Sequence, residues 1–395
     1  MCLSLQGFST RKYYKLFLVM NNHIVLLSTL YLIIVGFVLP YLLRERIFSM
    51  FFELNDLENE LLEDTKFHHR QKHSMAYLQA LEPGKTLPLY DARLRSGNIS
   101  HLIIALVRDP DHRRGSQYLT QLAVGLHEAS VDDNHTGIFF CNGTSEENPY
   151  LTKVAQHFPV YDVPKSNSED KLSFSSKREN KLKTAFLECV RLGLNQTNSA
   201  PLLVTVFNDN VLPLPHFSQD IKKIVRHKLS HRMSCGELIP RSDQWLFLHL
   251  QEPVGLRSYR YDTESLRELL LISLTGAVVF HVIFKVLDPH LSSRSVLFTF
   301  IYGGSLFLTF ALCMGRPYTT ELRRVTPALY RTYDPPEALH FSALTLPSSS
   351  FGMIEPLLRT IKCSQYVGFH RVLDSLINSL EIPGYVVSPS LVQYV

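Results

Sequence analysis

The chain of 395 residues lacks the short motifs that mark many well-known catalytic sites. It has no Gly-x-Ser-x-Gly, no His-Glu-x-x-His and no glycine-rich phosphate loop, which excludes the serine-hydrolase, zinc-protease and P-loop arrangements. Its six cysteines are too far apart in the sequence for a zinc site. The net charge of +4 is spread along the chain, so no nucleic-acid-binding surface is expected.

Three long hydrophobic segments are present instead, at residues 24–43, 269–287 and 296–314. A helix of about 20 apolar residues crosses a bilayer core, and each of these segments is close to that length. The connector between the second and third segments is so short that the two are predicted to form an antiparallel hairpin. Residues 44–268 and 315–395 are therefore predicted to lie on the same side of the membrane.

Two patterns predict that residues 1–23 form a cytosolic tail and that the body of the protein is lumenal. Basic residues near the first hydrophobic segment are more numerous before it than after it, as the positive-inside rule requires for this orientation. The first segment is predicted to be an uncleaved signal anchor, and a cleaved signal peptide is the alternative. The N-glycosylation sequons all fall between the first and second segments, at Asn98, Asn134, Asn142 and Asn195.

The lumenal part is predicted to consist of a stem and one folded domain. Residues 44–81 read as a helical stem, because leucines recur in it at helical spacing. Residues 82–268 and 315–395 are predicted to form one domain, since the second piece is too short for an α/β core of its own. The cysteines of this domain allow three disulfide pairings and are Cys141, Cys189, Cys235 and Cys363.

Short apolar runs alternate with helical patterns in the first part of this domain. The predicted buried strands are residues 101–107, 137–141, 201–207 and 245–249. The predicted helices are residues 116–128 and 180–194, with a polar loop over residues 164–178. Strand–helix–strand order with continuous apolar strands predicts an α/β fold, in which helices cover both faces of a parallel sheet.

Polar residues follow the first and third predicted strands, where open α/β sheets bind their ligands. Arg108 and Asp109 follow the first strand, and Asn208, Asp209 and Asn210 follow the third. An acidic side chain in such a position can hold Mg²⁺ or Mn²⁺ against a diphosphate. The alternative is that Asn-Asp-Asn forms a turn that binds nothing.

Several longer sequence segments resemble the post-GPI-attachment N-acetylgalactosamine transferases of the Golgi. The clearest is Gly-Arg-Pro-Tyr at 315–318 together with residues 321–330, directly after the predicted hairpin. Residues 139–142, the helix around Cys189 and the C-terminal segment 385–392 are also similar. A tandem hairpin inserted in a glycosyltransferase domain is a shared and unusual layout, so the resemblance extends over nearly the whole chain.

The resemblance implies a GT-A, Rossmann-like glycosyltransferase domain, split by a transmembrane hairpin and preceded by a signal-anchor helix. It implies transfer of N-acetylgalactosamine from UDP-GalNAc to the first mannose of the GPI glycan of an anchored protein, at the lumenal side of the Golgi membrane, with Mn²⁺ as cofactor. Asp209 is the implied metal ligand, and Asp209 and Asp374 are the implied catalytic carboxylates. The implied donor-binding residues are Arg108, Asp109, Asn208 and Asn210.

The sequence departs from the family where the chemistry is expected. The family's Glu-Asp-Asp triplet falls on Asn208, Asp209 and Asn210, and Tyr394 stands where the family has a histidine. An alternative to an active enzyme is therefore a catalytically weak or inactive relative that acts as a lumenal binding or regulatory protein. A third reading is a small transporter or channel, for which the His and Lys residues of the hairpin segments are His281 and Lys285.

Overall fold

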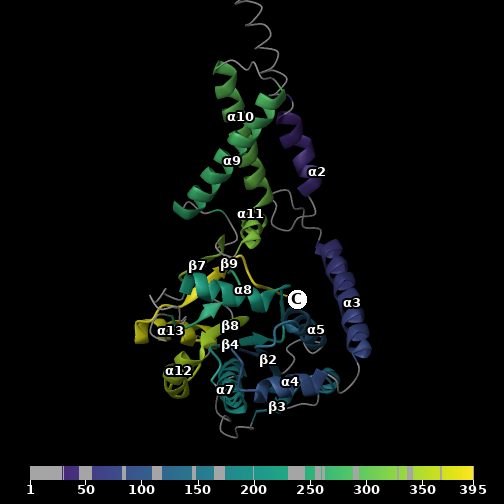
Figure 1. Ribbon diagram of the computed structural model, residues 1–395, viewed down its shortest axis with the longest axis vertical. Helices are drawn as coiled ribbons and strands as arrows, with labels where there is room; N and C mark the ends of the chain where they lie inside the picture. Colours follow the sequence, from purple (N-terminus) through teal and green to yellow (C-terminus); the bar gives the residue numbers. More distant parts are fainter. Residues whose placement is uncertain are drawn as a thin grey trace, which may run out of the picture. The chain divides into compact units, whose positions relative to one another are not determined.

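The chain folds into two compact units (Figure 1). One unit combines Met1–Asn55 with Val254–Leu322, and the other combines Asp56–Pro253 with Arg323–Val395. The computed structural model describes residues 29, 31–43, 56–81, 86–108, 118–144, 148–163, 174–198, 200–229, 245–253, 259, 263–287, 293–326, 329–335, 341–364 and 367–394.

The larger unit is built on an eight-stranded sheet with the strand order β3-β2-β1-β4-β8-β6-β9-β7. Strands β7, β8 and β9 come from the chain after the hydrophobic hairpin and the others from before it, so the domain is split as the sequence predicts. The strands of this sheet are β1 (His101–Val107), β2 (Thr136–Asn142), β3 (Val160–Asp162), β4 (Leu203–Asn208), β6 (Leu248–His249), β7 (Arg331–Tyr333), β8 (Ala343–Pro347) and β9 (Tyr385–Ser388). A separate antiparallel pair joins β5 (Val211–Pro213) to β10 (Val392–Tyr394).

The sheet is parallel on one side and mixed on the other. Strands β3, β2, β1 and β4 are parallel, as predicted for β2, β1 and β4 from their apolar runs, whereas β3 was not predicted. Strand β8 is antiparallel to both β4 and β6, and β7 is antiparallel to β9. The strands predicted from apolar runs, β1, β2, β4 and β6, therefore run in one direction, as expected, and the antiparallel pairs come from β7 and β8, which the sequence did not predict. Strand β8 enters from the edge where β4 ends, so it pairs with β4 without a crossover helix.

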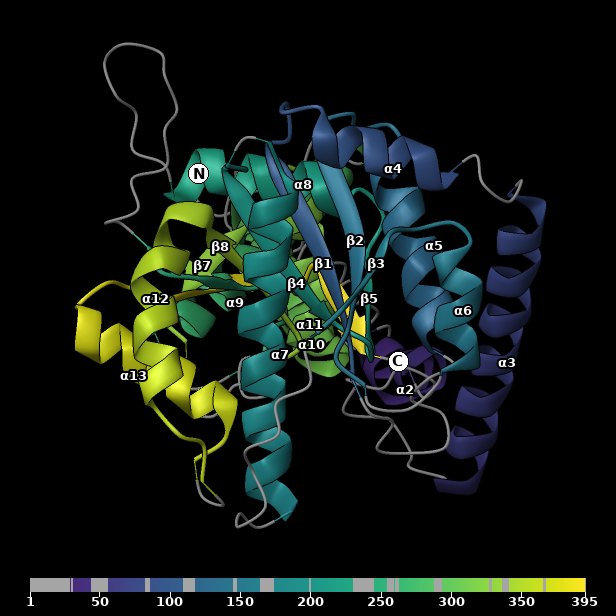
Figure 2. The same cartoon turned by 90° about the horizontal axis from the view of Figure 1, so that it is seen from below.

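Helices cover both faces of this sheet, as predicted. Along β1, Ile103, Ala105 and Val107 belong to one hydrophobic cluster, and Leu102, Ile104 and Leu106 belong to the other. This alternation follows from the two-residue period of a strand. Figure 2 shows α5 on one side of the strands and α12 and α13 on the other. The helices of this unit are α3 (Asp56–Ala80), α4 (Thr86–Arg95), α5 (Tyr118–Ser130), α6 (Pro149–Ala155), α7 (Phe174–Gln196), α8 (Phe217–Ile224), α12 (Ser348–Thr360) and α13 (Phe369–Leu380).

Two predicted boundaries differ from the structure. Helix α7 begins at Phe174, although the polar composition predicted a loop up to residue 178. In the added first turns Ser176 is buried, and its carbonyl oxygen accepts a hydrogen bond of 2.9 Å from Nδ2 of Asn180, so tertiary packing extends the helix into a polar stretch. Of the predicted strand 245–249, only Leu248 and His249 pair in the sheet, while Trp245 is fully buried in the core before the strand begins.

One disulfide ties the end of β2 to helix α7. It joins Cys141 to Cys189, both of which are buried. Sequence alone left three pairings open, and the fold selects this one because α7 lies against the face of the sheet that Cys141 faces. Cys235 lies outside the described residues.

The smaller unit contains the hydrophobic hairpin. Helices α9 (Thr263–Leu287) and α10 (Ser293–Met314) lie side by side, and each is long and apolar enough to cross a membrane (Figure 1). A Cβ on Gly303 would lie 2.3 Å from the Cβ of Phe280 and 2.7 Å from the carbonyl oxygen of Gly276, so only glycine allows this approach. Glycine at 303 and 304 therefore permits close packing of the two helices.

The first hydrophobic segment also belongs to the smaller unit. Its described part is helical over residues 31–43 and ends in α2 (Leu39–Leu43). Tyr31 and Thr309 form a hydroxyl–hydroxyl hydrogen bond of 2.6 Å, and Leu39 and Leu43 pack with Cys313. The rest of the predicted anchor lies outside the described residues.

Candidate active site

Several strands of the large sheet end at one edge, which we call the carboxyl edge. Strands β1, β2 and β4 are parallel, and β4 and β6 both run antiparallel to β8. Strand β9 is parallel to β6, so all five strands end together. The carboxyl edge is where open α/β folds bind ligands. Polar residues at or just after these strand ends are Arg108, Asn142, Asp209, Glu252 and Ser388.

Arg108 and Asp209 form an ion pair at this edge. The Nε and Nη2 atoms of Arg108 both donate to Oδ1 of Asp209 at 3.3 Å. The backbone N–H of Arg108 donates to Oδ2 at 3.1 Å, so both carboxylate oxygens are engaged by one residue. The Asp209 side chain is 10% exposed and that of Arg108 is 22% exposed. The structure thus brings together two residues that sequence analysis placed at the ends of different strands.

Asn208 shapes the turn that carries Asp209. Its Oδ1 accepts a hydrogen bond of 3.0 Å from the backbone N–H of Asp209, and its Nδ2 donates to the carbonyl oxygen of Phe341 at 3.2 Å. Its backbone N–H donates to the carbonyl oxygen of Ser342 at 2.8 Å. Asn208 therefore fixes the turn to the start of β8, and its predicted role in donor binding stays a prediction.

Asn210 differs from Asn208 in its hydrogen bonding. Its Oδ1 atom is buried and has no hydrogen-bond partner among the described residues. A buried amide oxygen without a partner costs free energy, so Asn210 differs from the satisfied Asn208 beside it. Asp109, the remaining predicted donor-binding residue, lies outside the described residues.

The residues at this edge do not fit a protein-held Mn²⁺ ion well. Such ions prefer several oxygen ligands, and acidic residues commonly supply some of them. Here two of the three triplet positions are neutral amides, and the one carboxylate already binds an arginine. Across the described ranges, no group of three or more His, Cys, Asp or Glu side chains is arranged to hold a metal.

Asp374 lies on α13, whose first turn approaches the carboxyl edge. The ring of Phe369 lies 5.4 Å from that of Phe341, the residue whose carbonyl binds Asn208. Asp374 is five residues further, which is about 7.5 Å along the helix axis. Its Oδ1 is buried without a partner among the described residues, and burial raises the pKa of its carboxyl to about 6. No described hydrogen bond links Asp374 to Asp209.

Gln121 on α5 is a candidate site residue that the sequence analysis missed. It is 4% exposed, and neither Nε2 nor Oε1 has a hydrogen-bond partner among the residues described. One turn later on the same helix face, a Cβ on Gly125 would lie 3.3 Å from the ring of Pro213 in β5. Both α5 and β5 lead away from the carboxyl edge. One helical turn from Gly125 toward that edge reaches Gln121, and two strand residues from Pro213 toward the same edge reach Val211, which are nearly equal distances. Gln121 therefore lies level with Val211, next to Asn210.

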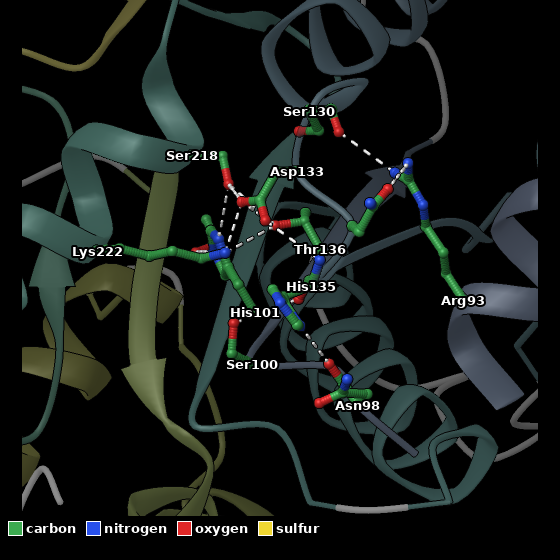
Figure 3. A network of polar contacts seen from close by, with 12 residues as sticks. Arg93, Asn98, Ser100, His101, Ser130, Asp133, His135, Thr136, Ser218 and Lys222 are labelled. Carbon is green, nitrogen blue, oxygen red and sulfur yellow. Dashed lines mark hydrogen bonds and ion pairs between the residues drawn. The ribbon is translucent and has the colours of Figure 1, made fainter. Parts of the chain in front are cut away.

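A second polar cluster lies at the opposite, amino edge of the sheet (Figure 3). Asp133 Oδ2 accepts hydrogen bonds from Ser218 and Thr136 at 2.8 Å and from Lys222 at 2.5 Å. Burial raises the pKa of Asp133, but these bonds together outweigh burial and hold the pKa well below the usual range. His101 Nε2 pairs with Thr205 at 2.7 Å, and burial lowers its pKa to about 3. Although it contains Ser, His and Asp, the cluster satisfies its own hydrogen bonds and holds its Asp away from the His, so it reads as structural.

The predicted glycosylation residues differ in accessibility. Asn98, Asn134 and Asn195 are exposed. Asn142 is half-buried at the end of β2, and its Nδ2 donates to Asp162 Oδ1 at 2.7 Å. The loops of Asn98 and Asn134 adjoin at the amino edge, where Nδ1 of His135 lies 3.1 Å from the carbonyl oxygen of Asn98 (Figure 3).

Comparison with known families agrees with this arrangement. A family model described as GPI-N-acetylgalactosamine transferase PGAP4 matches residues 100–393. The match begins just before β1 and ends within β10, so it spans the whole sheet and the hairpin inserted in it. It covers most of the chain and confirms the resemblance seen in the sequence. The chain therefore belongs to the GPI-N-acetylgalactosamine transferase PGAP4 family.

Proposed function

We propose that this protein transfers N-acetylgalactosamine from UDP-GalNAc to a mannose of GPI anchors at the lumenal side of the Golgi membrane. The observation that carries the proposal is the family match, which extends over the whole split sheet. Its two membrane-length helices would keep the enzyme in the bilayer that holds a lipid-anchored acceptor.

The polar residues of the carboxyl edge support a donor site there. Transfer leaves a diphosphate whose growing negative charge must be stabilised, and the guanidinium of Arg108 is the cation at this position. The acceptor hydroxyl must lose a proton, and Asp374, with its pKa near 6, is the candidate base. The Mn²⁺ ion expected from the family stays a prediction, and the chemistry it would supply is neutralisation of the diphosphate.

One observation favours a second function. Two of the three triplet acids are replaced by Asn208 and Asn210, and the third is paired with Arg108. A family member with these changes can keep the fold and bind a nucleotide sugar without turning it over. The second candidate is therefore a lumenal protein that binds or regulates without catalysis.

UDP release by the purified full chain in detergent separates the two functions. With UDP-GalNAc and a GPI glycan acceptor, the active enzyme should release UDP. Asp209→Asn should lower kcat/KM at least about tenfold, because the guanidinium of Arg108 loses its charged partner. Asp132→Asn, an exposed change near the amino edge, should leave the rate unchanged. UDP binding without release from any donor would support the non-catalytic function.

A further inference from the structure

The ion pair at the carboxyl edge bears on how the donor diphosphate is neutralised. Asp209 is the only carboxylate left at the three triplet positions, and Arg108 binds both of its oxygens. A metal ion at Asp209 would have to displace a guanidinium fixed by two side-chain donors. Arg108 also keeps donors that Asp209 does not use, because a guanidinium carries five N–H groups.

The summed charge of Arg108 and the three triplet positions points the same way. Arg108, Asp209 and the two neutral asparagines sum to zero. Three acids beside the same arginine would sum to −2, which would repel a diphosphate until a divalent cation cancelled it. The substitutions at 208 and 210 therefore remove the charge for which a cation is needed, and they leave the arginine in place.

The pair is also positioned to reach a ligand. Arg108 is the first residue after β1, at the edge where α/β sheets bind nucleotides. Its side chain is partly exposed, whereas Asp209 is nearly buried beneath it. A planar guanidinium matches the geometry of phosphate oxygens and is the preferred side chain for bidentate phosphate contacts.

We propose that this site binds the diphosphate of its donor without a divalent cation, using the guanidinium of Arg108 as a charged hydrogen-bond donor to the phosphate oxygens. Asp209 acts as a positioning residue that orients the guanidinium through Nε and Nη2. This rests on the proposed function, since it takes a uridine diphosphate sugar as the donor. The proposal explains why neutral Asn208 and Asn210 can stand where the family has acidic residues.

Titration calorimetry with UDP on the full chain in detergent tests the proposal. Wild-type protein should bind UDP in EDTA with a Kd within about twofold of that measured in Mn²⁺. Arg108→Ala should raise Kd about tenfold or more in both conditions, because a charged hydrogen-bond donor is lost. Arg108→Lys should bind UDP with intermediate affinity, since lysine keeps the positive charge but loses the planar guanidinium that makes bidentate phosphate contacts. Arg359→Ala is the matched control, because it removes an ion pair with Glu188 and Glu355 on helices and not at a strand end.

A second variant tests the same idea from the opposite direction and does not depend on removing the arginine. The double change Asn208→Asp with Asn210→Asp is nearly isosteric and adds two negative charges. It should raise Kd for UDP about tenfold in EDTA, and Mn²⁺ should restore binding. The proposal predicts this new cation dependence in the double variant alone.

Two outcomes would overturn the proposal, and they have different meanings. If wild-type binding is lost in EDTA and returns with Mn²⁺, the cation is required, and the proposed transferase function survives. If UDP binds in neither condition, the donor assignment fails, and the inference fails with it.

Discussion

Asp374 carries a carboxyl group whose protonation state depends on the fold. Burial raises its pKa to about 6 from the ordinary value of 3.8, so folding favours the protonated form. The stability that the protonated carboxyl contributes is fully present below pH 3.8 and is lost as the pH rises through 6. At neutral pH the ionised carboxylate is a base held in an unfavourable environment.

Asp374→Asn should therefore stabilise the protein at pH 7.5, by about 1–2 kcal/mol after allowance for partial exposure, because asparagine resembles the protonated form. Thermal unfolding in detergent should show a higher Tm for the variant at pH 7.5 and no difference at pH 3.5. If Asp374 is the base, kcat should also fall about 10²–10⁴-fold. A normal kcat with the expected Tm shift would leave Asp374 as a buried acid without a catalytic role.

Gln121 gives a second prediction at the scale of one residue. Its buried amide has no partner for either polar atom among the described residues, so Gln121→Leu should raise stability by about 1 kcal/mol. The same change should raise Kd for UDP if the amide serves the ligand. Ser130→Ala is the matched control, because its buried hydroxyl also has no partner in the described chain but lies at the amino edge. A Gln121→Leu variant with unchanged UDP affinity would remove Gln121 from the site.

Among the elements, the hairpin depends on the close contact of its two helices. Gly303→Leu should destabilise the smaller unit by about 1–3 kcal/mol, because a Cβ there overlaps Phe280 and the backbone of Gly276. The matched control is Gly36→Leu, also in a hydrophobic helix, where a Cβ would meet nothing within 4 Å. Tm in detergent and resistance of the hairpin to protease should fall for Gly303→Leu only. Equal stability of the two variants would contradict tight packing at Gly303.

The strands show what the sequence could and could not predict. Strands β1, β2 and β4 were predictable, because each is a continuous apolar run that ends at a polar turn. Strands of three residues, such as β3, β5 and β7, are too short to show an alternation of apolar and polar residues. They form because they can pair with the edge of a neighbouring strand. The direction of β8 depends on which edge the chain enters from, and no local pattern encodes this.

The site was predictable in position and not in its interactions. Strand ends placed Arg108 and Asn208 to Asn210 at one edge, and the structure confirms that they meet there. Their ion pair joins residues far apart in the sequence, so its geometry depends on the register of β1 and β4. Gln121 could not be identified from sequence, because its lack of partners is a property of the packing of α5 on β5.

At the scale of the whole molecule, the sequons test the predicted orientation. Asn98, Asn134 and Asn195 are exposed, and each should carry a glycan if the larger unit is lumenal. Each Asn→Gln change at these positions should increase gel mobility by one step. Asn142→Gln should change it least, because its Nδ2 donates to Asp162 and is half-buried. Unchanged mobility for all four variants would contradict the lumenal orientation.

The position of β6 in the sheet has a consequence for the order of synthesis. Strand β6 comes from before the hairpin, yet its neighbours β8 and β9 both come from after it. A nascent chain that has emerged only as far as β6 therefore has an open edge on β4 and no place for β6. The sheet can be completed only after both hydrophobic helices have left the ribosome, so a chain cut short before β8 should keep an exposed strand edge on β4 that quality control can recognise.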